Sequence, residues 1–404
     1  MTFVIFGATG DLAKRKLYTA LDKLNTKVIG IGRKNLNNKE FRKFVEKGSK
    51  VSKKFLNNLS YYKADFKDKD FLRNLKVKNP VFYLAVSYEF MPIIVKQLKR
   101  FKNAKVVFEK PFGHSLASSN KLDKSIKSVF ADKNIYRIDH YLAKQTVQNI
   151  LGIRFSNPLF ENVWNNKFIN HIHIVSEENI GVEQRLEYYD KAGAIRDMIQ
   201  SHLLQIASLV LMEPPKTLQS VDVHNEKVKI LKCIKPSKVI TGQYKGYKIK
   251  SNIETYAEVK LVCNAKRWKG TPILLKTGKK LKKKQAYVEI EFKKTFCKLY
   301  CNPFVKSNKL IINIQPKQDI IFDLNTLTDE RRIEPVEMQF CHTCKFGPNT
   351  IEAYQRLLSD VIKGDKTLFT TSDELKQSWI ITDKIEKLKK KPIIYSKEPK
   401  GLIH

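Results

Sequence analysis

Short apolar runs alternate with amphipathic segments along the first third of the chain. Residues 2–6 (TFVIF) are apolar, β-branched or aromatic and stop at a glycine, which predicts a buried parallel strand. Residues 11–24 carry apolar side chains at helical spacing, and 27–31 form the next apolar run. Two further runs, 81–86 and 105–110, flank another predicted helix. This alternation predicts a doubly wound parallel sheet of the α/β class.

The pattern changes after residue 152, where apolar and polar residues begin to alternate with period two. Such alternation indicates antiparallel strands with one covered face. The segments concerned are 171–180, 255–265, 286–292, 309–316 and 319–324. We expect the amphipathic segments 193–213 and 351–365 to be helices that cover this sheet. The sequence therefore predicts an α/β dinucleotide-binding domain over 1–139, followed over 140–404 by an α+β domain with a large, mainly antiparallel sheet.

Composition is that of a folded globular protein, since 42% of its 404 residues are hydrophobic. We find no apolar stretch of about 18 residues and no signal-peptide pattern, so we expect a cytoplasmic protein without a membrane partner. The six cysteines are too few and too scattered for a disulfide framework, which predicts reduced thiols. Cys341 and Cys344 form the motif CHTC, but without a second pair we expect no metal or redox site there.

The net charge of +36 is compatible with an enzyme for anionic ligands and with a nucleic-acid-binding protein. Lysines occur along the whole chain, as at 279–284 and 386–391, and arginine is scarce beside lysine. Base recognition favours arginine, and no nucleic-acid-binding motif occurs. We therefore expect no specific nucleic-acid partner, while a basic protein that binds phosphate or nucleic acid without catalysis remains the alternative from another class.

A glycine-containing loop follows the first predicted strand and precedes the first helix, where free N–H groups and the helix dipole attract a pyrophosphate. Its candidate cofactor-binding residues are Gly7, Ala8, Thr9, Gly10, Asp11 and Leu12. A simple tight turn would use the same glycines. Arg33 follows the second strand, where an NAD enzyme would place an acidic residue, and it suits the 2′-phosphate of NADP. Because basic residues are abundant in this chain, NAD stays possible.

The segment at 137–144, RIDHYLAK, offers a carboxylate, an imidazole, a phenol and an ammonium group within a few residues. It closely resembles the substrate motif RIDHYLGK of the glucose-6-phosphate dehydrogenase family. Three other segments resemble that family in the same order: 7–16 (GATGDLAKRK), 109–113 (EKPFG) and 188–205 (YYDKAGAIRDMIQSHLLQ). The resemblance implies a Rossmann domain, a sheet domain used for dimerisation, and a homodimer or a dimer of dimers. It also implies NADP-dependent oxidation of glucose 6-phosphate to the phosphogluconolactone, the first step of the oxidative pentose phosphate pathway, without a metal.

The same resemblance implies roles for individual residues. His202 would be the general base that removes the proton from the C1 hydroxyl, with Asp139 orienting it, and a neutral imidazole can accept a proton at working pH. His140, Tyr141 and Lys144 would bind the substrate phosphate. The implied substrate-binding set is Lys16, Lys110, His140, Tyr141, Lys144, Glu178, Asp197, Lys279, Lys284 and Gln315. Lys110 would also contact the cofactor, and the family's proline that follows it is often cis.

Several alternatives stay open at this point. His202 could be a histidine satisfied within its helix, and the protein could be another NAD(P)-dependent sugar or sugar-phosphate dehydrogenase. The residues do not decide whether a second, structural NADP binds the sheet domain. His171 and His173, two residues apart on a predicted strand, suggest a metal site, but we reject it because no third ligand is placed with them.

Overall fold

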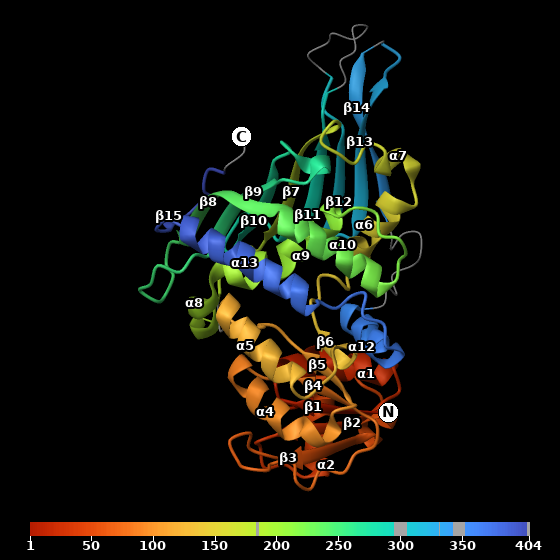
Figure 1. The fold of residues 1–404 in the computed structure, drawn as a ribbon, viewed down its shortest axis with the longest axis vertical. Coiled ribbons are helices and arrows are strands. Elements are labelled where there is room, and N and C mark those ends of the chain that lie inside the picture. The colour runs from red at the N-terminus through yellow and green to blue at the C-terminus, as the bar shows by residue number, and fades with distance from the viewer. Residues whose placement is uncertain (183–185, 295–304, 331, 342–351, 402–404) are drawn as a thin grey trace. The chain divides into compact units, whose positions relative to one another are not determined.

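The structure is a computed structural model that describes residues 1–182, 186–294, 305–330, 332–341 and 352–401 (Figure 1). The chain divides into two compact units. The first comprises Met1–Ala143 and Ile351–Lys376, and the second comprises Lys144–Thr350 and Gln377–His404.

The first unit contains a six-stranded parallel sheet in the order β3-β2-β1-β4-β5-β6. Its strands are β1 (Thr2–Phe6), β2 (Lys27–Gly32), β3 (Leu59–Lys63), β4 (Pro80–Leu84), β5 (Lys105–Phe108) and β6 (Ile135–Arg137). The predicted parallel sheet is confirmed. Strand order reverses between β1 and β4, the switch point beside which doubly wound sheets bind their ligands.

Helical segments connect these strands. They are η1 (Ala13–Leu17), α1 (Tyr18–Lys23), α2 (Asn38–Gly48), α3 (Lys53–Asn57), η2 (Tyr88–Phe90), α4 (Met91–Gln97), η3 (Leu98–Phe101), α5 (Leu116–Lys127) and η4 (Asp132–Asn134). The start of α2 shows how local chemistry sets a boundary, because the Asn37 side chain accepts the Glu40 N–H while the Glu40 carboxylate accepts the Asn37 N–H. This capping box satisfies two N–H groups that the helix leaves unpaired.

Helix α12 (Ala353–Lys363) belongs to the first unit, although it lies more than 200 residues after β6. Its apolar residues Leu357, Leu358 and Val361 are fully buried in the same core as Phe3 of β1. The expectation that 351–365 covers the antiparallel sheet is therefore wrong, and the observed division differs from the predicted one at 139/140. An amphipathic pattern reveals that a helix has a buried face but not which core receives it.

The second unit is built on a nine-stranded sheet in the order β14-β13-β12-β11-β7-β10-β9-β8-β15. Its strands are β7 (Ile169–Glu177), β8 (Ile234–Tyr244), β9 (Tyr256–Cys263), β10 (Ile273–Gly278), β11 (Gln285–Phe292), β12 (Lys309–Gln315), β13 (Asp319–Leu327), β14 (Ile333–Cys341) and β15 (Ile393–Tyr395). The pairs β7/β10 and β8/β15 are parallel and the other pairs are antiparallel. The predicted large, mainly antiparallel sheet is confirmed.

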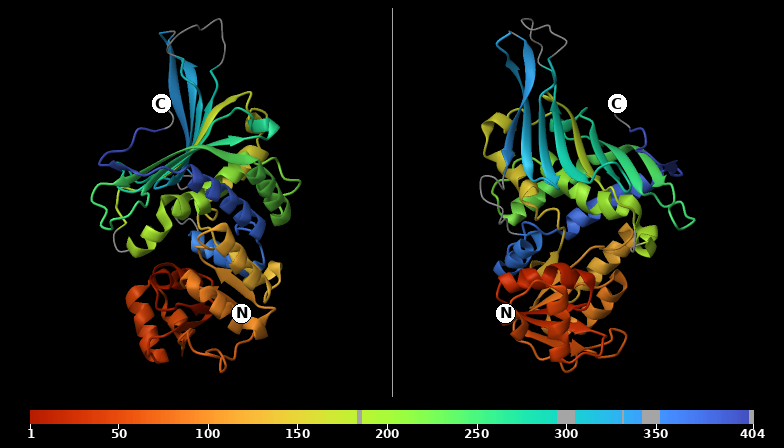
Figure 2. Two further views of the ribbon diagram at one scale, coloured as in Figure 1. Left: turned by 60° about the vertical axis from the view of Figure 1, so that its left-hand side comes forward. Right: turned by 180° about the vertical axis from the view of Figure 1, so that it is seen from behind.

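Among the described residues, helices cover one face of this sheet and none covers the other, as the two views in Figure 2 show for α6, α9 and α10. The helical segments are α6 (Gln145–Phe155), α7 (Pro158–Glu161), α8 (Leu186–Ala194), η6 (Ile195–Leu203), α9 (Leu204–Leu211), α10 (Ser220–Cys233), η7 (Lys266–Trp268) and α13 (Ser372–Leu388), which begins in the first unit. None of the helices in the described part of the chain combines the length and apolarity needed to cross a membrane.

The cysteines depart from the prediction at one position. Cys233 and Cys263 are free thiols, but Cys341, the last residue of β14, takes part in a disulfide. The expectation of reduced thiols throughout is therefore wrong. The number and spacing of cysteines argue against a framework of several disulfides, but they do not exclude one isolated disulfide. Cys344 of the CHTC motif lies outside the described residues.

Candidate active site

The glycine loop ties the end of β1 to β2. The N–H groups of Gly7 and Ala8 both donate to the Ile31 carbonyl oxygen, at 3.0 and 3.1 Å. Gly7 has φ +83°, and a Cβ there would lie 2.3 Å from the Ala85 carbonyl oxygen, so this position requires glycine. Gly10 is exposed where the helix begins, and among the described residues an added Cβ would meet only the Gly7 carbonyl oxygen. The loop thus fits the close approach of a dinucleotide phosphate to the backbone.

The tip of β2 lies beside this loop. A Cβ added at Gly32 would lie 3.7 Å from the Thr9 hydroxyl oxygen, and the exposed Arg33 follows directly. The sequence analysis did not identify a role for Gly30. A Cβ at this position would come within 2.8 Å of the Ala8 Cβ and 2.5 Å of the Phe41 ring. The glycine at Gly30 therefore allows the loop to pack against β2.

The EKPFG segment follows β5, and its Lys110–Pro111 peptide bond is cis. Glu109, just before Lys110, is buried and accepts hydrogen bonds from the phenols of Tyr83 and Tyr354. Burial raises the Glu109 pKa, and the hydrogen bonds from Tyr83 and Tyr354 oppose that shift. Tyr354 comes from α12, so the late segment of the chain supports the strand end that carries Lys110. Neither partner of Glu109 was foreseen from the sequence.

The RIDHYLAK segment runs across the boundary between the two units. Asp139 and His140 follow β6 in the first unit, and Asp139 Oδ1 accepts the N–H of Tyr141 at 2.9 Å. Lys144 already belongs to the second unit, where its Nζ donates to Oε1 of Gln315, another predicted substrate residue. Within the second unit the structure thus brings together two residues that are 171 positions apart.

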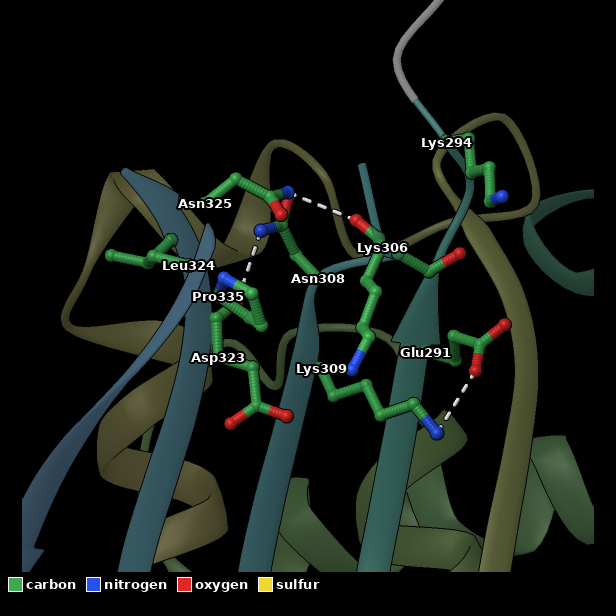
Figure 3. Close-up of a pocket in the computed structure, with 10 residues that line it drawn as sticks. Glu291, Lys294, Lys306, Asn308, Lys309, Asp323, Leu324, Asn325 and Pro335 are labelled. Atoms are coloured by element: carbon green, nitrogen blue, oxygen red, sulfur yellow. Dashed lines mark hydrogen bonds and ion pairs between the residues drawn. The ribbon is translucent and has the colours of Figure 1, made fainter. Parts of the chain in front are cut away.

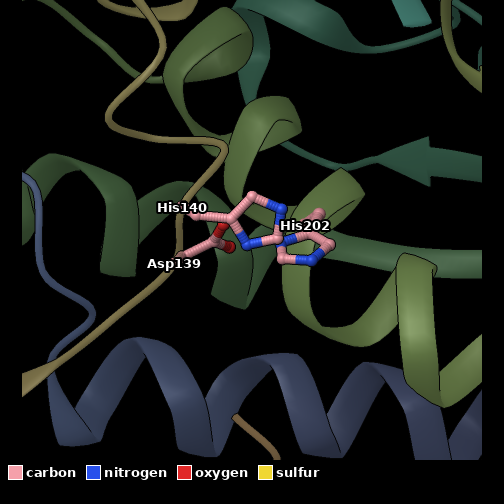
Figure 4. Close-up of side chains that lie close together, drawn as sticks. All are labelled: Asp139, His140 and His202. Carbon is pink, nitrogen blue, oxygen red and sulfur yellow. The ribbon is translucent and has the colours of Figure 1, made fainter. Parts of the chain in front are cut away.

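His202 and Asp197 both lie on η6, which is a π-helix, and both side chains are buried. The Ser201 hydroxyl donates to the Asp197 carbonyl oxygen at 2.7 Å. Figure 4 draws His202 on this helix with Asp139 and His140, which follow β6. Turns of the π type, with i→i+5 hydrogen bonds, are rare and frequently occur at functional sites. A period of 3.6 residues predicted a helix here but could not predict its π geometry.

The start of η6 is fixed by a carboxylate that sequence reasoning missed. Glu254 is fully buried, its Oε1 accepts the Ile195 N–H at 3.2 Å, and its Oε2 accepts from Lys389 Nζ at 2.9 Å. Burial raises the Glu254 pKa, and the charge of Lys389 opposes that shift. Gly193 has φ 67° and ψ 174°, and a Cβ there would lie 2.3 Å from Glu254 Oε1. Glycine at this position therefore leaves room for the group that orients η6.

Glu178 and Lys279 meet because they follow two neighbouring parallel strands. Glu177 ends β7 and pairs with Gly278, which ends β10, so the next residue of each strand leaves the sheet at the same edge. Lys279 Nζ lies 2.5 Å from Glu178 Oε2 and 5.5 Å from the centre of the Tyr189 ring. Burial raises the Tyr189 pKa, and the nearby Asp197 and Glu178 raise it further. Three predicted substrate residues, Glu178, Asp197 and Lys279, are thus grouped around Tyr189, which was not predicted.

Two other predicted substrate residues are on other elements. Lys284 is exposed just before β11, and the described contacts of Glu178 and Lys279 do not include it. Lys16 lies on η1 of the first unit, exposed, with its Nζ 3.6 Å from Glu352 Oε2.

The metal site at His171 and His173 was rejected because no third ligand was placed with them, but the structure does place a third potential ligand there. Glu289 of β11 lies beside both rings and is paired directly with His173 across the sheet. Its position 116 residues after His173 gave no sequence signal.

Two family models match the chain over nearly its whole length. The NAD binding domain of glucose-6-phosphate dehydrogenase matches residues 4–149, and the C-terminal domain of glucose-6-phosphate dehydrogenase matches 151–402. The chain belongs to the glucose-6-phosphate dehydrogenase family. The resemblance inferred from four short motifs is therefore confirmed.

Curated relatives and solved structures of the family match over most of their length. Glucose-6-phosphate 1-dehydrogenase of Borreliella burgdorferi is 40% identical over 93% of this chain and 89% of its own, and that of Bacillus subtilis is 36% identical over 95% and 90%. A glucose-6-phosphate dehydrogenase solved with its substrate glucose 6-phosphate is 30% identical, with a TM-score of 0.92 over 100% of this chain and 96% of its own. The enzyme of Mycobacterium avium is 27% identical, with a TM-score of 0.89 over 98% and 93%.

Proposed function

We propose that this protein oxidises D-glucose 6-phosphate to 6-phospho-D-glucono-1,5-lactone with NADP. The match over the whole chain to a family structure solved with glucose 6-phosphate carries the proposal. The glycine loop, with Arg33 beyond the neighbouring strand tip, fits an NADP molecule. When bound, this cofactor supplies the acceptor for the hydride that leaves C1.

His202 takes the proton of the C1 hydroxyl as the C1–H bond breaks and the C1=O bond forms. Asp139 orients the ring and stabilises the imidazolium that results. His140, Tyr141 and Lys144 bind the phosphate. By holding this group they fix the position of the substrate, and therefore of C1, in the site. Glu178 and Asp197 accept hydrogen bonds from sugar hydroxyls, while Lys279 offers a cation beside them.

The direct test is to follow NADPH formation with glucose 6-phosphate, free glucose and 6-phosphogluconate as substrates. We expect turnover with glucose 6-phosphate only. An equal rate with free glucose would contradict the roles of His140, Tyr141 and Lys144, and turnover of 6-phosphogluconate alone would assign a different sugar-phosphate dehydrogenase activity.

Arg33→Glu should shift cofactor preference from NADP toward NAD. We expect kcat/KM for NADP to fall about 10- to 100-fold, because a lost hydrogen bond between charged groups costs about 1.5–3 kcal/mol and the new carboxylate repels the 2′-phosphate. The value for NAD should change little. Lys39→Glu, an exposed change on α2, is the control for altered surface charge; an unchanged NADP/NAD ratio in Arg33→Glu would place the 2′-phosphate elsewhere.

Lys279→Ala should raise KM for glucose 6-phosphate about 10- to 100-fold, since it removes the cation paired with Glu178 in the proposed substrate group. Steady-state kinetics at saturating NADP measure this change. Lys282→Ala removes an exposed lysine of the same run and should leave KM within about twofold. Equal effects of the two substitutions would mean that the general positive charge of the segment matters rather than the Lys279 position.

A further inference from the structure

A cluster of two histidines and two glutamates lies on the face of the nine-stranded sheet that the helices leave uncovered. His171 and His173 alternate along β7 with Ile172 and Ile174, both fully buried on the helix-covered face. Across the sheet, His171 pairs with Glu291 and His173 pairs with Glu289 of β11. Register alone therefore brings all four polar side chains to one patch, and none of the four is among the residues assigned to the reaction above.

The donor atoms of this cluster are spaced like the ligands of a small metal ion. His173 Nδ1 lies 3.4 Å and His171 Nε2 lies 3.7 Å from the same atom, Glu289 Oε1. His171 Nε2 also lies 3.8 Å from Glu291 Oε2. Zinc bound tetrahedrally at about 2.0–2.2 Å from each ligand requires ligand atoms roughly 3.3–3.6 Å apart. The histidine–glutamate distances are close to that spacing, and one donor atom of each of His171, His173 and Glu289 lies within 4.8 Å of the other two.

The cluster contains two buried nitrogen atoms without a hydrogen bond. The Nε2 atoms of His171 and His173 make none among the described residues, although His171 Nε2 lies within ion-pair distance of Glu289 and Glu291. The rings stack with centroids 4.2 Å apart, so each reduces the access of water to the other. A buried polar atom without a partner costs about 1–3 kcal/mol and calls for an explanation, such as an ion.

The charges around the cluster also favour a cation. Glu289 and Glu291 contribute two carboxylates and Lys309 one ammonium group, which leaves a net charge of −1 beside the two imidazoles. Lys309 Nζ pairs with Glu291 Oε2 at 3.1 Å and with Glu289 Oε2 at 3.6 Å, so Glu289 Oε1 stays directed at the histidines. Figure 3 shows the Lys309–Glu291 pair at the edge of a neighbouring cavity of about 260 Å³.

We propose that His171, His173 and Glu289 bind a divalent transition-metal ion of the zinc class, with Glu291 next to the ion. Imidazole nitrogen and carboxylate oxygen are ligands that zinc accepts, and three protein ligands leave a fourth position for water. The ion would join β7 to β11 in the middle of the sheet. The site is independent of the proposed dehydrogenase activity.

The test is zinc binding by the full-length protein after treatment with a chelator and dialysis. Isothermal titration with Zn²⁺ measures affinity and stoichiometry, and Co²⁺ serves as a spectroscopic probe, because its visible absorption reports the coordination geometry. We expect one bound ion per chain in the original protein. His173→Gln and Glu289→Gln should each weaken binding at least tenfold, because each removes one of three ligands.

His114→Gln is the matched control, since it removes an exposed histidine outside the cluster and should bind zinc like the original protein. Circular dichroism of every variant checks that the fold is retained. Failure of the original protein to bind zinc would overturn the proposal, as would binding that survives both His173→Gln and Glu289→Gln, which would place the ion elsewhere, for example at the CHTC segment. Neither result depends on whether the protein oxidises glucose 6-phosphate.

Discussion

Replacement of His202 by asparagine is expected to lower kcat by roughly 10²- to 10⁴-fold, the range that general base catalysis supplies. Asparagine keeps a polar side chain of similar size but cannot accept the proton of the C1 hydroxyl. The KM for glucose 6-phosphate should stay near its original value, because the proposed phosphate-binding residues are untouched. Steady-state kinetics with saturating NADP measure both constants.

A second buried histidine of the same unit provides the control for this experiment. His224 lies on α10, and His224→Asn should keep kcat within severalfold of the original. If His202→Asn raised KM and left kcat intact, His202 would be a binding residue. If both variants lost activity equally, general damage to the fold would account for the loss.

Gly193→Ala is expected to have the largest effect among substitutions outside the proposed reacting groups. A backbone at φ 67°, ψ 174° is open essentially only to glycine, so strain alone costs about 1–3 kcal/mol. The new methyl group would also displace the Glu254 carboxylate, which the Ile195 N–H and Lys389 both need. We expect the free energy of unfolding to fall by about 2–5 kcal/mol. The remaining folded protein should show reduced kcat, because η6 carries His202.

Gly246→Ala is the control for Gly193→Ala, because it introduces an alanine at positive φ without a clash with Glu254. Gly246 also has positive φ, +85°, but an added Cβ would meet nothing within 4 Å among the described residues. Urea unfolding should therefore show a smaller loss for Gly246→Ala than for Gly193→Ala, with kcat unchanged. Equal losses of stability would mean that the contact with Glu254 contributes little.

Several strands with one or two buried faces could be predicted from the sequence, although the buried β10 was missed. All of β1 is buried except the partly exposed Thr2, and β11 alternates cleanly, so both gave a clear signal. In contrast, β14 is exposed at nearly every position, which removes the alternation that identifies a strand. The strand β8 contains Pro236 and a register shift between Pro236 and Lys238, both of which interrupt a strand pattern.

Site residues that are neighbours in the sequence could be predicted, whereas residues brought together only by the fold were harder to connect. The residues in 137–144 stand together in the sequence, so their chemistry was visible at once. Glu178 and Lys279 are 101 residues apart, and only the parallel pairing of β7 with β10 shows why they meet. Glu254 was missed because an isolated acid in a loop has no signature. The histidine pair was visible, but its third partner depended on the register between β7 and β11.

The position of α12 has a consequence for how the protein is made. The core of the first unit includes side chains that the ribosome adds more than 200 residues after β6. Domains generally fold as units while the chain is still being synthesised, the N-terminal one first. Here the nascent cofactor-binding unit would keep an apolar surface uncovered until almost the entire polypeptide has emerged, so a fragment that ends at Ala143 should aggregate instead of folding alone.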